Sequence, residues 1–143
     1  DLIRASATAD ALAAGRQRLP DTPALREFHF GEWDGLAFSE VAERWPDLSR
    51  RYWEEPGHIA PPGGESWIAA ASRIDAAADA LAASHPGRDI IAVAHFGAIL
   101  TQVQRAARIS PYEALAQTIA NLSVTCLQND SNGWHLRSVN HLA

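Results

Sequence analysis

The stretch DIIAVAHFG, residues 89–97, decides the fold prediction. Within residues 89–94, the five residues after Asp89 form a continuous apolar run that follows a Pro-Gly turn signal, a pattern typical of a buried strand in a parallel sheet. Residues 98–107 then have the pattern of a helix. His95 is therefore expected directly after a strand and before a helix. This places it at the carboxyl edge of the sheet, where open α/β folds bind their ligands.

Helical patterns alternate with this strand along the rest of the chain. The strongest runs over residues 66–84, is rich in alanine and has Ser66 as its expected N-cap. Other helices are expected at 2–19, 39–45 (capped by Ser39), 48–53 and 111–119, and a hairpin at 123–128 and 134–139. The alternation predicts an α/β fold. Since no linker interrupts it, residues 1–143 are expected to form a single domain.

The composition is that of an ordinary folded domain. The 143 residues carry 12 basic and 17 acidic side chains, and 47% of them are hydrophobic, which excludes a disordered chain. The formal net charge of −5 argues against nucleic acid or an anionic membrane as a partner. The single cysteine, Cys126, rules out an internal disulfide and favours a cytoplasmic setting. No apolar run is long enough to predict a membrane span.

Three residues are candidates for chemistry. His95 lies at the strand–helix junction, where a glycine at position 97 lets the backbone approach an anion. Glu27 lies in a loop rich in aromatic residues, and desolvation there would disfavour its charged form, as suits a general acid. Arg4 lies in the first turn of the first helix, and its planar guanidinium could hold a phosphate. Taken singly, each also fits a plain structural role: a strand-end histidine, a surface glutamate and a solvated helix arginine.

Three further patterns narrow the choice of chemistry. Gly63-Gly64 precedes the helix start at Ser66 and could present N–H groups to an anion, but it lacks the lysine and spacing of a nucleotide-binding P-loop. The six histidines have no metal-ligand spacing, so no metal site is expected. No Gly-x-Ser-x-Gly motif occurs, which argues against a serine hydrolase of the α/β-hydrolase type.

Taken in order, these segments resemble the histidine phosphatase superfamily, also called phosphoglycerate mutase-like. Residues 1–9 (DLIRASATA) are similar to the family's S-x-L-x-R-A-x-Q-T-A helix, and residues 25–35 (LREFHFGEWDG) to its L-x-E-x-x-F-G-x-W-E-G segment. Residues 91–97 (IAVAHFG) are similar to its V-x-H-G-G segment, and residues 121–125 to its closing hairpin. The glycine loop is most similar to that of the small branch near alpha-ribazole phosphatase.

The resemblance implies a fold, a reaction and residue roles. The fold is a three-layer α/β sandwich whose mostly parallel sheet is flanked by helices. The reaction is hydrolysis of a small phosphate monoester through a phosphohistidine intermediate, without a cofactor. The substrate would be of the alpha-ribazole phosphate, phosphoglycerate or sugar phosphate type. Glu27 would give a proton to the leaving oxygen, and His95 and Arg4 would neutralise the phosphoryl oxygens. Phe96 stands where the family usually has glycine; its N–H remains for the substrate while its side chain narrows the pocket.

The family's nucleophile is the histidine of an Arg-His-Gly motif, and no such triplet occurs in the 143 residues. Since the chain also has no methionine, we expect that an upstream segment with the nucleophile and a central first strand is missing, and that the chain alone is inactive. Without that strand, apolar surface would favour association, as in a homo-oligomer. The alternative is an inactive remnant that binds phosphate or a partner. In both cases Arg4, Glu27 and His95 are expected to converge on one cleft.

Overall fold

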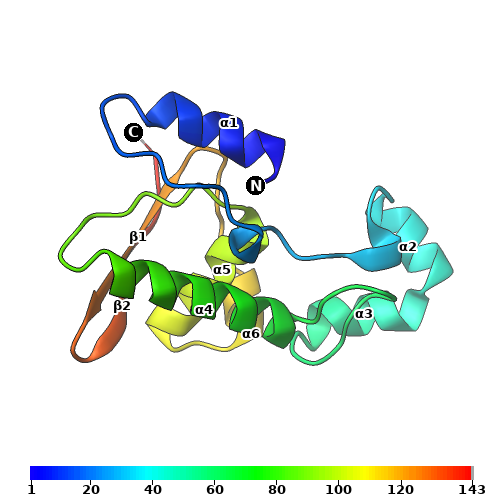
Figure 1. Cartoon of the computed structure of the whole chain (residues 1–143). Coiled ribbons are helices and arrows are strands. Elements are labelled where there is room, and N and C mark those ends of the chain that lie inside the picture. The colour runs from blue at the N-terminus through cyan, green and yellow to red at the C-terminus, as the bar shows by residue number, and fades with distance from the viewer. Residues whose placement is uncertain (143) are drawn as a thin grey trace.

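The computed structural model describes residues 1–142 as a mainly helical molecule with one hairpin (Figure 1). Its helices are α1 (Ile3–Leu12), α2 (Phe38–Arg44), α3 (Pro46–Glu54), α4 (Trp67–Ser84), α5 (Phe96–Ala107) and α6 (Pro111–Leu115), with the 3-10 turns η1 (Pro23–Leu25) and η2 (Gly31–Trp33); its strands are β1 (Val124–Asp130) and β2 (Gly133–His141). In Figure 1, α2 and α3 lie together at one end and the hairpin lies toward the other. None of these helices is both long and apolar enough to cross a membrane.

The main core lies between α4 and α5. Helix α4 begins where the sequence predicts, because the Ser66 hydroxyl accepts a hydrogen bond from the Ala69 N–H at 3.2 Å. The Trp67 indole N–H then donates to Oε1 of Gln104 on α5 at 2.6 Å, which ties the two helices together. The buried residues of this core are Phe28, Trp67, Ala70, Ile74, Ala98, Leu100 and Ala114.

A second, smaller core is aromatic and joins α2 and α3 to the loop before them. Trp33, Val41 and Tyr52 are its buried members. The rings of Trp33 and Tyr52 meet edge to face, with centroids 5.2 Å apart and planes at 81°, an arrangement that aromatic pairs favour. Phe30 packs against both cores and therefore connects the core around α3 to the loop that contains Glu27.

Several helix boundaries differ from the predicted ones for local reasons. Helix α1 ends at Leu12 instead of continuing to residue 19. Beyond it, the Arg18 guanidinium bonds to Asp10 and Asp21 and folds the chain back. Ser39 is not the N-cap of α2, which begins one residue earlier. Helices α3 and α5 each start two residues before their predicted limits, and α6 ends at Leu115 rather than at residue 119.

The buried parallel strand predicted at 89–94 is not formed. No strand lies between α4 and α5, and Ile91 is 62% exposed. Within residues 1–142 the sheet consists of β1 and β2 alone, paired antiparallel with Leu127 opposite Leu136. A strand forms where a neighbour completes its hydrogen bonds, and no segment of the described chain pairs with this one. The predicted three-layer, mostly parallel sheet is therefore wrong for these residues, whereas the hairpin is confirmed.

Candidate functional site

The N-terminus of α5 is the centre of the candidate site. His95 holds the N-cap position with extended backbone (φ −126°, ψ 165°), but its side chain does not cap the helix. Glu27 does so from a distant part of the chain: its Oε2 accepts a hydrogen bond from the Gly97 N–H at 3.0 Å, and its Oε1 accepts one from the Ala98 N–H at 3.2 Å. A carboxylate suits this place, because the first N–H groups of a helix lack partners and carry partial positive charge. Glu27 and His95 thus lie at the same helix end.

Gly97 is required for this close approach. A Cβ at position 97 would lie 2.6 Å from Oε1 of Glu27 and 3.1 Å from Cδ1 of Phe28, closer than carbon atoms pack. The Phe28 N–H donates a further hydrogen bond to Oε1 of Glu27 at 3.0 Å. Backbone donors therefore hold the carboxyl group of Glu27 in place, a feature that the aromatic character of the loop did not predict.

His95 is buried but keeps both ring nitrogens available. The residue is 7% exposed, its nitrogens make no hydrogen bond within residues 1–142, and neither nitrogen is fully closed off from solvent. Burial lowers the pKa of His95, the positive charge of Arg4 lowers it further, and the negative charge of Glu27 acts in the opposite direction. The neutral imidazole is therefore favoured, and the charge of Arg4 reaches it from α1.

Arg4 and Phe96 complete the set of predicted residues. Arg4 is exposed in the first turn of α1, and its guanidinium makes no hydrogen bond or ion pair within residues 1–142. The N–H of Phe96 is the first of α5 and has no acceptor in the same part of the chain, while the side chain is 47% exposed. Groups that can bind an anion therefore lie at the start of α5 and on α1.

Beside Glu27 an apolar cavity of about 60 Å³ opens between the two cores. It is lined by Glu27, Phe28, Phe30, Tyr52, Trp53, Pro56, Trp67, Phe96, Gly97 and Leu115. The lining is almost entirely carbon, and the Glu27 carboxylate lies at the boundary between this cavity and the N-terminus of α5.

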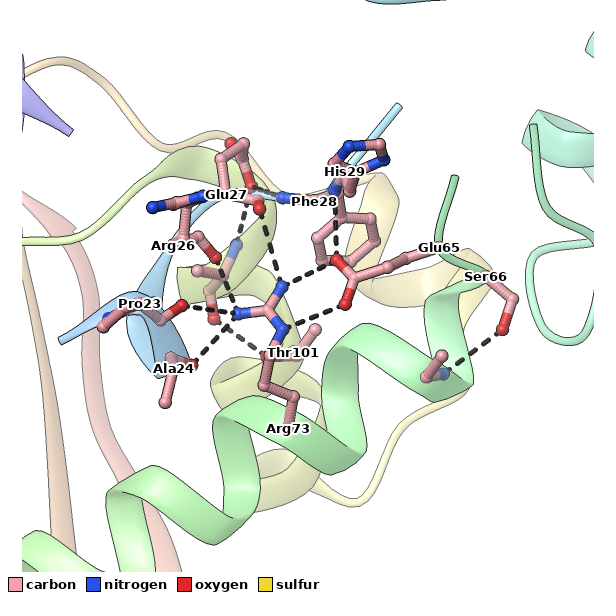
Figure 2. Close-up of polar contacts among 12 residues, drawn as sticks. Pro23, Ala24, Arg26, Glu27, Phe28, His29, Glu65, Ser66, Arg73 and Thr101 are labelled. Carbon is pink, nitrogen blue, oxygen red and sulfur yellow. Dashed lines mark hydrogen bonds and ion pairs between the residues drawn. The ribbon is translucent and has the colours of Figure 1, made fainter. Parts of the chain in front are cut away.

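Sequence reasoning missed two residues that hold the Glu27 segment. Figure 2 shows the Arg73 guanidinium of α4 surrounded by acceptors. Its Nε and Nη2 donate to the two carboxylate oxygens of Glu65 at 2.9 and 2.7 Å. Its Nη1 donates to the backbone carbonyls of Ala24 and Arg26 at 3.0 and 3.1 Å. Arg73 thus fixes the chain immediately before Glu27 to the middle of α4, and we call it and Glu65 the Arg73–Glu65 clamp.

Glu65 extends the clamp to the other side of Glu27. Its Oε2 accepts a hydrogen bond from the His29 N–H at 3.0 Å, and its own N–H donates to the His29 carbonyl at 2.7 Å. Hydrogen bonding to Arg73 lowers the pKa of Glu65, and the His29 N–H contributes in the same direction. The signal available in the sequence was weak, because the acceptors of Arg73 include backbone carbonyls, which any residue type supplies.

The glycine loop serves backbone packing. The Glu32 N–H donates to the Pro62 carbonyl at 2.9 Å. A Cβ on Gly64 would lie 2.6 Å from the His29 carbonyl oxygen, and one on Gly31 (φ +56°) would collide with the Pro62 carbonyl. These glycines therefore let two loops lie in contact. In the part of the chain that the structure describes, no group of three His, Cys, Asp or Glu side chains is placed to hold a metal ion.

Residues 1–142 match the family model described as histidine phosphatase superfamily (branch 1). The chain belongs to this superfamily. Known relatives extend the match. The chain is 30% identical over 149 residues to phosphoglycerate mutase-like protein 4 of Arabidopsis thaliana, covering 99% of this chain and 64% of that protein. It is 41% identical over 71 residues to a bifunctional protein of Mycobacterium tuberculosis, covering 50% of this chain and 19% of that protein. The chain thus spans less than two thirds of these relatives.

Solved structures of the superfamily share the fold. YhfR of Bacillus stearothermophilus superimposes with a TM-score of 0.89 at 24% identity, covering 99% of this chain and 71% of that one. Mycobacterial glucosyl-3-phosphoglycerate phosphatase, solved with inorganic phosphate, gives 0.83 at 31% identity over 98% and 73%. The alpha-ribazole phosphatase of Shigella flexneri gives 0.81 at 21% identity over 98% and 70%. These superpositions confirm the overall arrangement of the phosphoglycerate mutase-like fold, although residues 1–142 form only the β1–β2 hairpin of its sheet, and alpha-ribazole phosphatases are among the structural neighbours.

Proposed function

We propose that this histidine phosphatase chain supplies the acid–base and anion-binding groups of a phosphomonoester hydrolase, with residues 1–143 forming one domain. The observation that carries the proposal is the position of the Glu27 carboxylate on the N–H groups of Gly97 and Ala98, directly after His95. A proton donor and an anion-binding helix end are thereby neighbours. A phosphoryl group bound at the helix end would present its ester oxygen to Glu27.

In the proposed reaction, a histidine nucleophile attacks phosphorus, and an N–P bond forms as the ester P–O bond breaks. Protonated Glu27 gives its proton to the leaving oxygen, which departs as an alcohol. His95, Arg4 and the Phe96 N–H bind the non-bridging oxygens and stabilise the charge that develops on them. The Glu27 carboxylate then takes a proton from water, the water oxygen attacks phosphorus, and the N–P bond breaks to release phosphate.

A second candidate is a phosphate-binding member of the superfamily without catalysis. It is favoured by one observation: the 143 residues contain no Arg-His-Gly triplet, the family's nucleophile motif. The complete coding sequence separates the two candidates, because such a triplet after a short apolar strand would supply the nucleophile. For the substrate, alpha-ribazole phosphate, phosphoglycerate and sugar phosphate types remain the proposed classes, and a cytoplasmic setting and a homo-oligomer stay predictions.

The test of Glu27 uses the protein expressed from its complete coding sequence. Glu27→Gln should lower turnover of alkyl phosphates by roughly 10²–10⁴-fold, because a poor leaving group needs the proton. The loss should be much smaller on dinitrophenyl phosphate, whose leaving group departs without protonation. An equal loss on both substrates would contradict the role of proton donor. His95→Ala should lower turnover by on the order of 10²-fold or more on both substrates, because it removes charge stabilisation.

A second test uses the 143-residue chain itself. It should bind inorganic phosphate weakly without hydrolysing aryl phosphates, and binding should weaken at high salt as the charges are screened. Arg4→Gln should weaken binding further, whereas Arg16→Gln, also exposed and near the end of α1, should not. Equal binding by both variants would remove Arg4 from the proposed site.

A further inference from the structure

The cavity beside Glu27 has room for more than water. Its volume is about 60 Å³, and one water molecule needs only about 10–15 Å³ measured in this way. Aromatic rings from three parts of the chain line it, among them Phe30, Trp53 and Trp67. Apolar side chains form no hydrogen bonds with water, and burying an apolar group against them is favourable. An apolar group is therefore the favoured occupant of this cavity.

Two polar groups of the lining residues have no hydrogen-bonding partner within residues 1–142: the indole N–H of Trp53, which is half-buried, and the hydroxyl of Tyr52. Tyr52 is 5% exposed and lines the cavity, yet its hydroxyl makes no hydrogen bond within residues 1–142 and is not fully enclosed by protein. A buried tyrosine hydroxyl normally finds a partner. Burial raises the pKa of Tyr52, and the negative charges of Glu27 and Glu65 add to this effect, so the hydroxyl stays a neutral donor. Because Tyr52 is the more deeply buried of the two residues, its hydroxyl is the group we assign to a ligand in the cavity.

Charge at the cavity disfavours a second anion. Among the ten lining residues Glu27 is the only charged one. At the nearby end of α3, Glu54 and Glu55 lie next to the cavity residues 53 and 56, and they pair with Arg50 at 2.9 Å and Arg51 at 3.6 Å on their own helix. Those arginine charges are thus offset. A carboxylate on the alcohol part of a substrate would meet Glu27 without meeting a free cation.

The proposed chemistry connects these facts. A general acid must touch the leaving oxygen, so the carbon attached to that oxygen must lie beside Glu27. The N-terminus of α5 binds the Glu27 carboxylate, and Phe96 and Gly97 from this helix end line the cavity together with Glu27, so the two places adjoin at Glu27. We infer that the cavity binds the alcohol part of the substrate, and that this alcohol is uncharged and mainly apolar, with the Tyr52 hydroxyl bonding its single polar group. This inference rests on the proposed function, and it disfavours the phosphoglycerate type among the proposed substrate classes, because the alcohol part of a phosphoglycerate carries a carboxylate.

The experiment measures binding to the 143-residue chain by tryptophan fluorescence, since Trp53 and Trp67 line the cavity. The ligands are inorganic phosphate, the n-alkyl phosphates from methyl to hexyl, and O-phosphoserine. Each buried methylene should strengthen binding roughly fourfold until the cavity is full, after which the affinity should level off. O-phosphoserine should bind no more tightly than methyl phosphate, because its carboxylate and ammonium groups would both lose water on entering an apolar cavity.

Two variants locate the effect. Leu115→Phe reduces the cavity volume and should make the affinity level off at a shorter alkyl chain. Tyr52→Phe should weaken binding of 3-hydroxypropyl phosphate several-fold and leave propyl phosphate unchanged, because it removes only the hydroxyl. Tyr112→Phe is the matched control, since Tyr112 is 61% exposed and is not part of the lining; it should change neither.

The outcomes separate this inference from the proposed function. Affinity that rises with alkyl length and depends on Leu115 supports both. If inorganic phosphate binds but alkyl length has no effect, or O-phosphoserine binds most tightly, the apolar-alcohol inference is wrong and the phosphate site stands. If none of the ligands binds, inorganic phosphate included, the anion-binding role proposed for His95 and Arg4 is wrong, and the inference built on it is overturned as well.

Discussion

The candidate site has two sides that are built differently: the side of Glu27 and the side of Arg4 and His95. Glu27 receives three backbone hydrogen bonds, and the Arg73–Glu65 clamp holds the chain on both sides of it. On the other side, Arg4 is exposed and neither it nor the His95 ring has a hydrogen-bonding partner within residues 1–142. The first part of the segment that leads to His95, residues 89–92, is also exposed.

This difference shows which part of the site these residues organise by themselves. A carboxylate at a helix N-terminus is held before any ligand arrives, which is the condition for effective proton transfer. Arg4 and His95, in contrast, have no hydrogen-bonding partner in the described part of the protein, because the bound anion itself would be that partner. Substitutions on the Glu27 side should therefore change the molecule more than substitutions at Arg4.

The largest effect should follow from breaking the clamp. Arg73→Ala leaves Glu65 and the carbonyls of Ala24 and Arg26 without their donor, although the Arg73 and Glu65 side chains are only about three quarters buried. We expect the free energy of unfolding, measured in urea, to fall by about 2–3 kcal/mol. Arg73→Lys should recover only part of this loss, because an ammonium cannot reproduce the bidentate fork.

Arg50→Ala is the control for this prediction. Arg50 also pairs with a glutamate, Glu54 at 2.9 Å, but both side chains are more than half exposed. Its removal should lower the free energy of unfolding by about 0–0.5 kcal/mol. Equal losses for Arg73→Ala and Arg50→Ala would mean that the clamp does not stabilise the Glu27 segment.

A smaller effect should follow from crowding the carboxylate. In Gly97→Ala the new Cβ would lie 2.6 Å from Oε1 of Glu27, so the carboxylate must move away from the helix end. Although alanine is the better helix former by about 1 kcal/mol, we expect a net loss of about 1–2 kcal/mol in the free energy of unfolding from the weakened hydrogen bonds. Gly57→Ala, whose Cβ would meet no atom closer than 4.0 Å, is the control.

A double-mutant cycle ties the Gly97 effect to Glu27. If the loss arises from displacing the carboxylate, Glu27→Gln and Gly97→Ala should be non-additive, because both disturb the same contact. Additive losses in the free energy of unfolding would indicate that Gly97→Ala acts through the ring of Phe28, which also lies near the new Cβ.

The same contrast explains what sequence reasoning could and could not predict. The helix that starts after His95 was predicted from a local pattern and is confirmed, whereas the functional roles of Glu27 and His95, predicted from residue types and order, stay predictions. Helix α4 and the hairpin were also predicted, because their capping and turn signals are local. Arg73 was missed because its partners include backbone carbonyls brought near only by tertiary folding.

The predicted strand at 89–94 was wrong for a related reason. An apolar, β-branched run shows that a segment can be a buried strand, but the state depends on which segments pair with it. Within residues 1–142 no segment does so, and Ile90 and Ile91 are exposed instead. Pairing partners far away in the sequence leave no signal inside the segment itself.

Acid should reduce the stability that Glu65 contributes through the Arg73–Glu65 clamp. Its pKa lies below the ordinary value of 4.5, first because of its hydrogen bond to Arg73. A carboxyl with a lowered folded-state pKa contributes stability that is complete above its unfolded-state pKa and is lost as the pH falls through the folded-state pKa. The stability difference between wild type and Glu65→Gln should therefore be constant near neutral pH and narrow below about pH 4.5. Glu43→Gln, at an exposed position without an ion pair within residues 1–142, should show no such trend.

The smallest expected effect is that of the Arg4 charge on the pKa of His95. The pKa of His95 is lowered mainly by burial and next by Arg4. A lowered histidine pKa means that the unfolded chain binds the proton more readily, so stability rises with pH through the window that ends near 6.5 and falls on acidification. Arg4→Gln should move the pKa of His95 upward, as followed by NMR titration of the ring, and narrow that window. Because Arg4 is exposed, added salt should produce part of the same upward shift in the wild type and almost none in Arg4→Gln. Arg16→Gln should leave the titration unchanged. If neither Arg4→Gln nor salt changes the pKa of His95, burial sets that pKa without Arg4, and Arg4 and His95 do not share one anion-binding site.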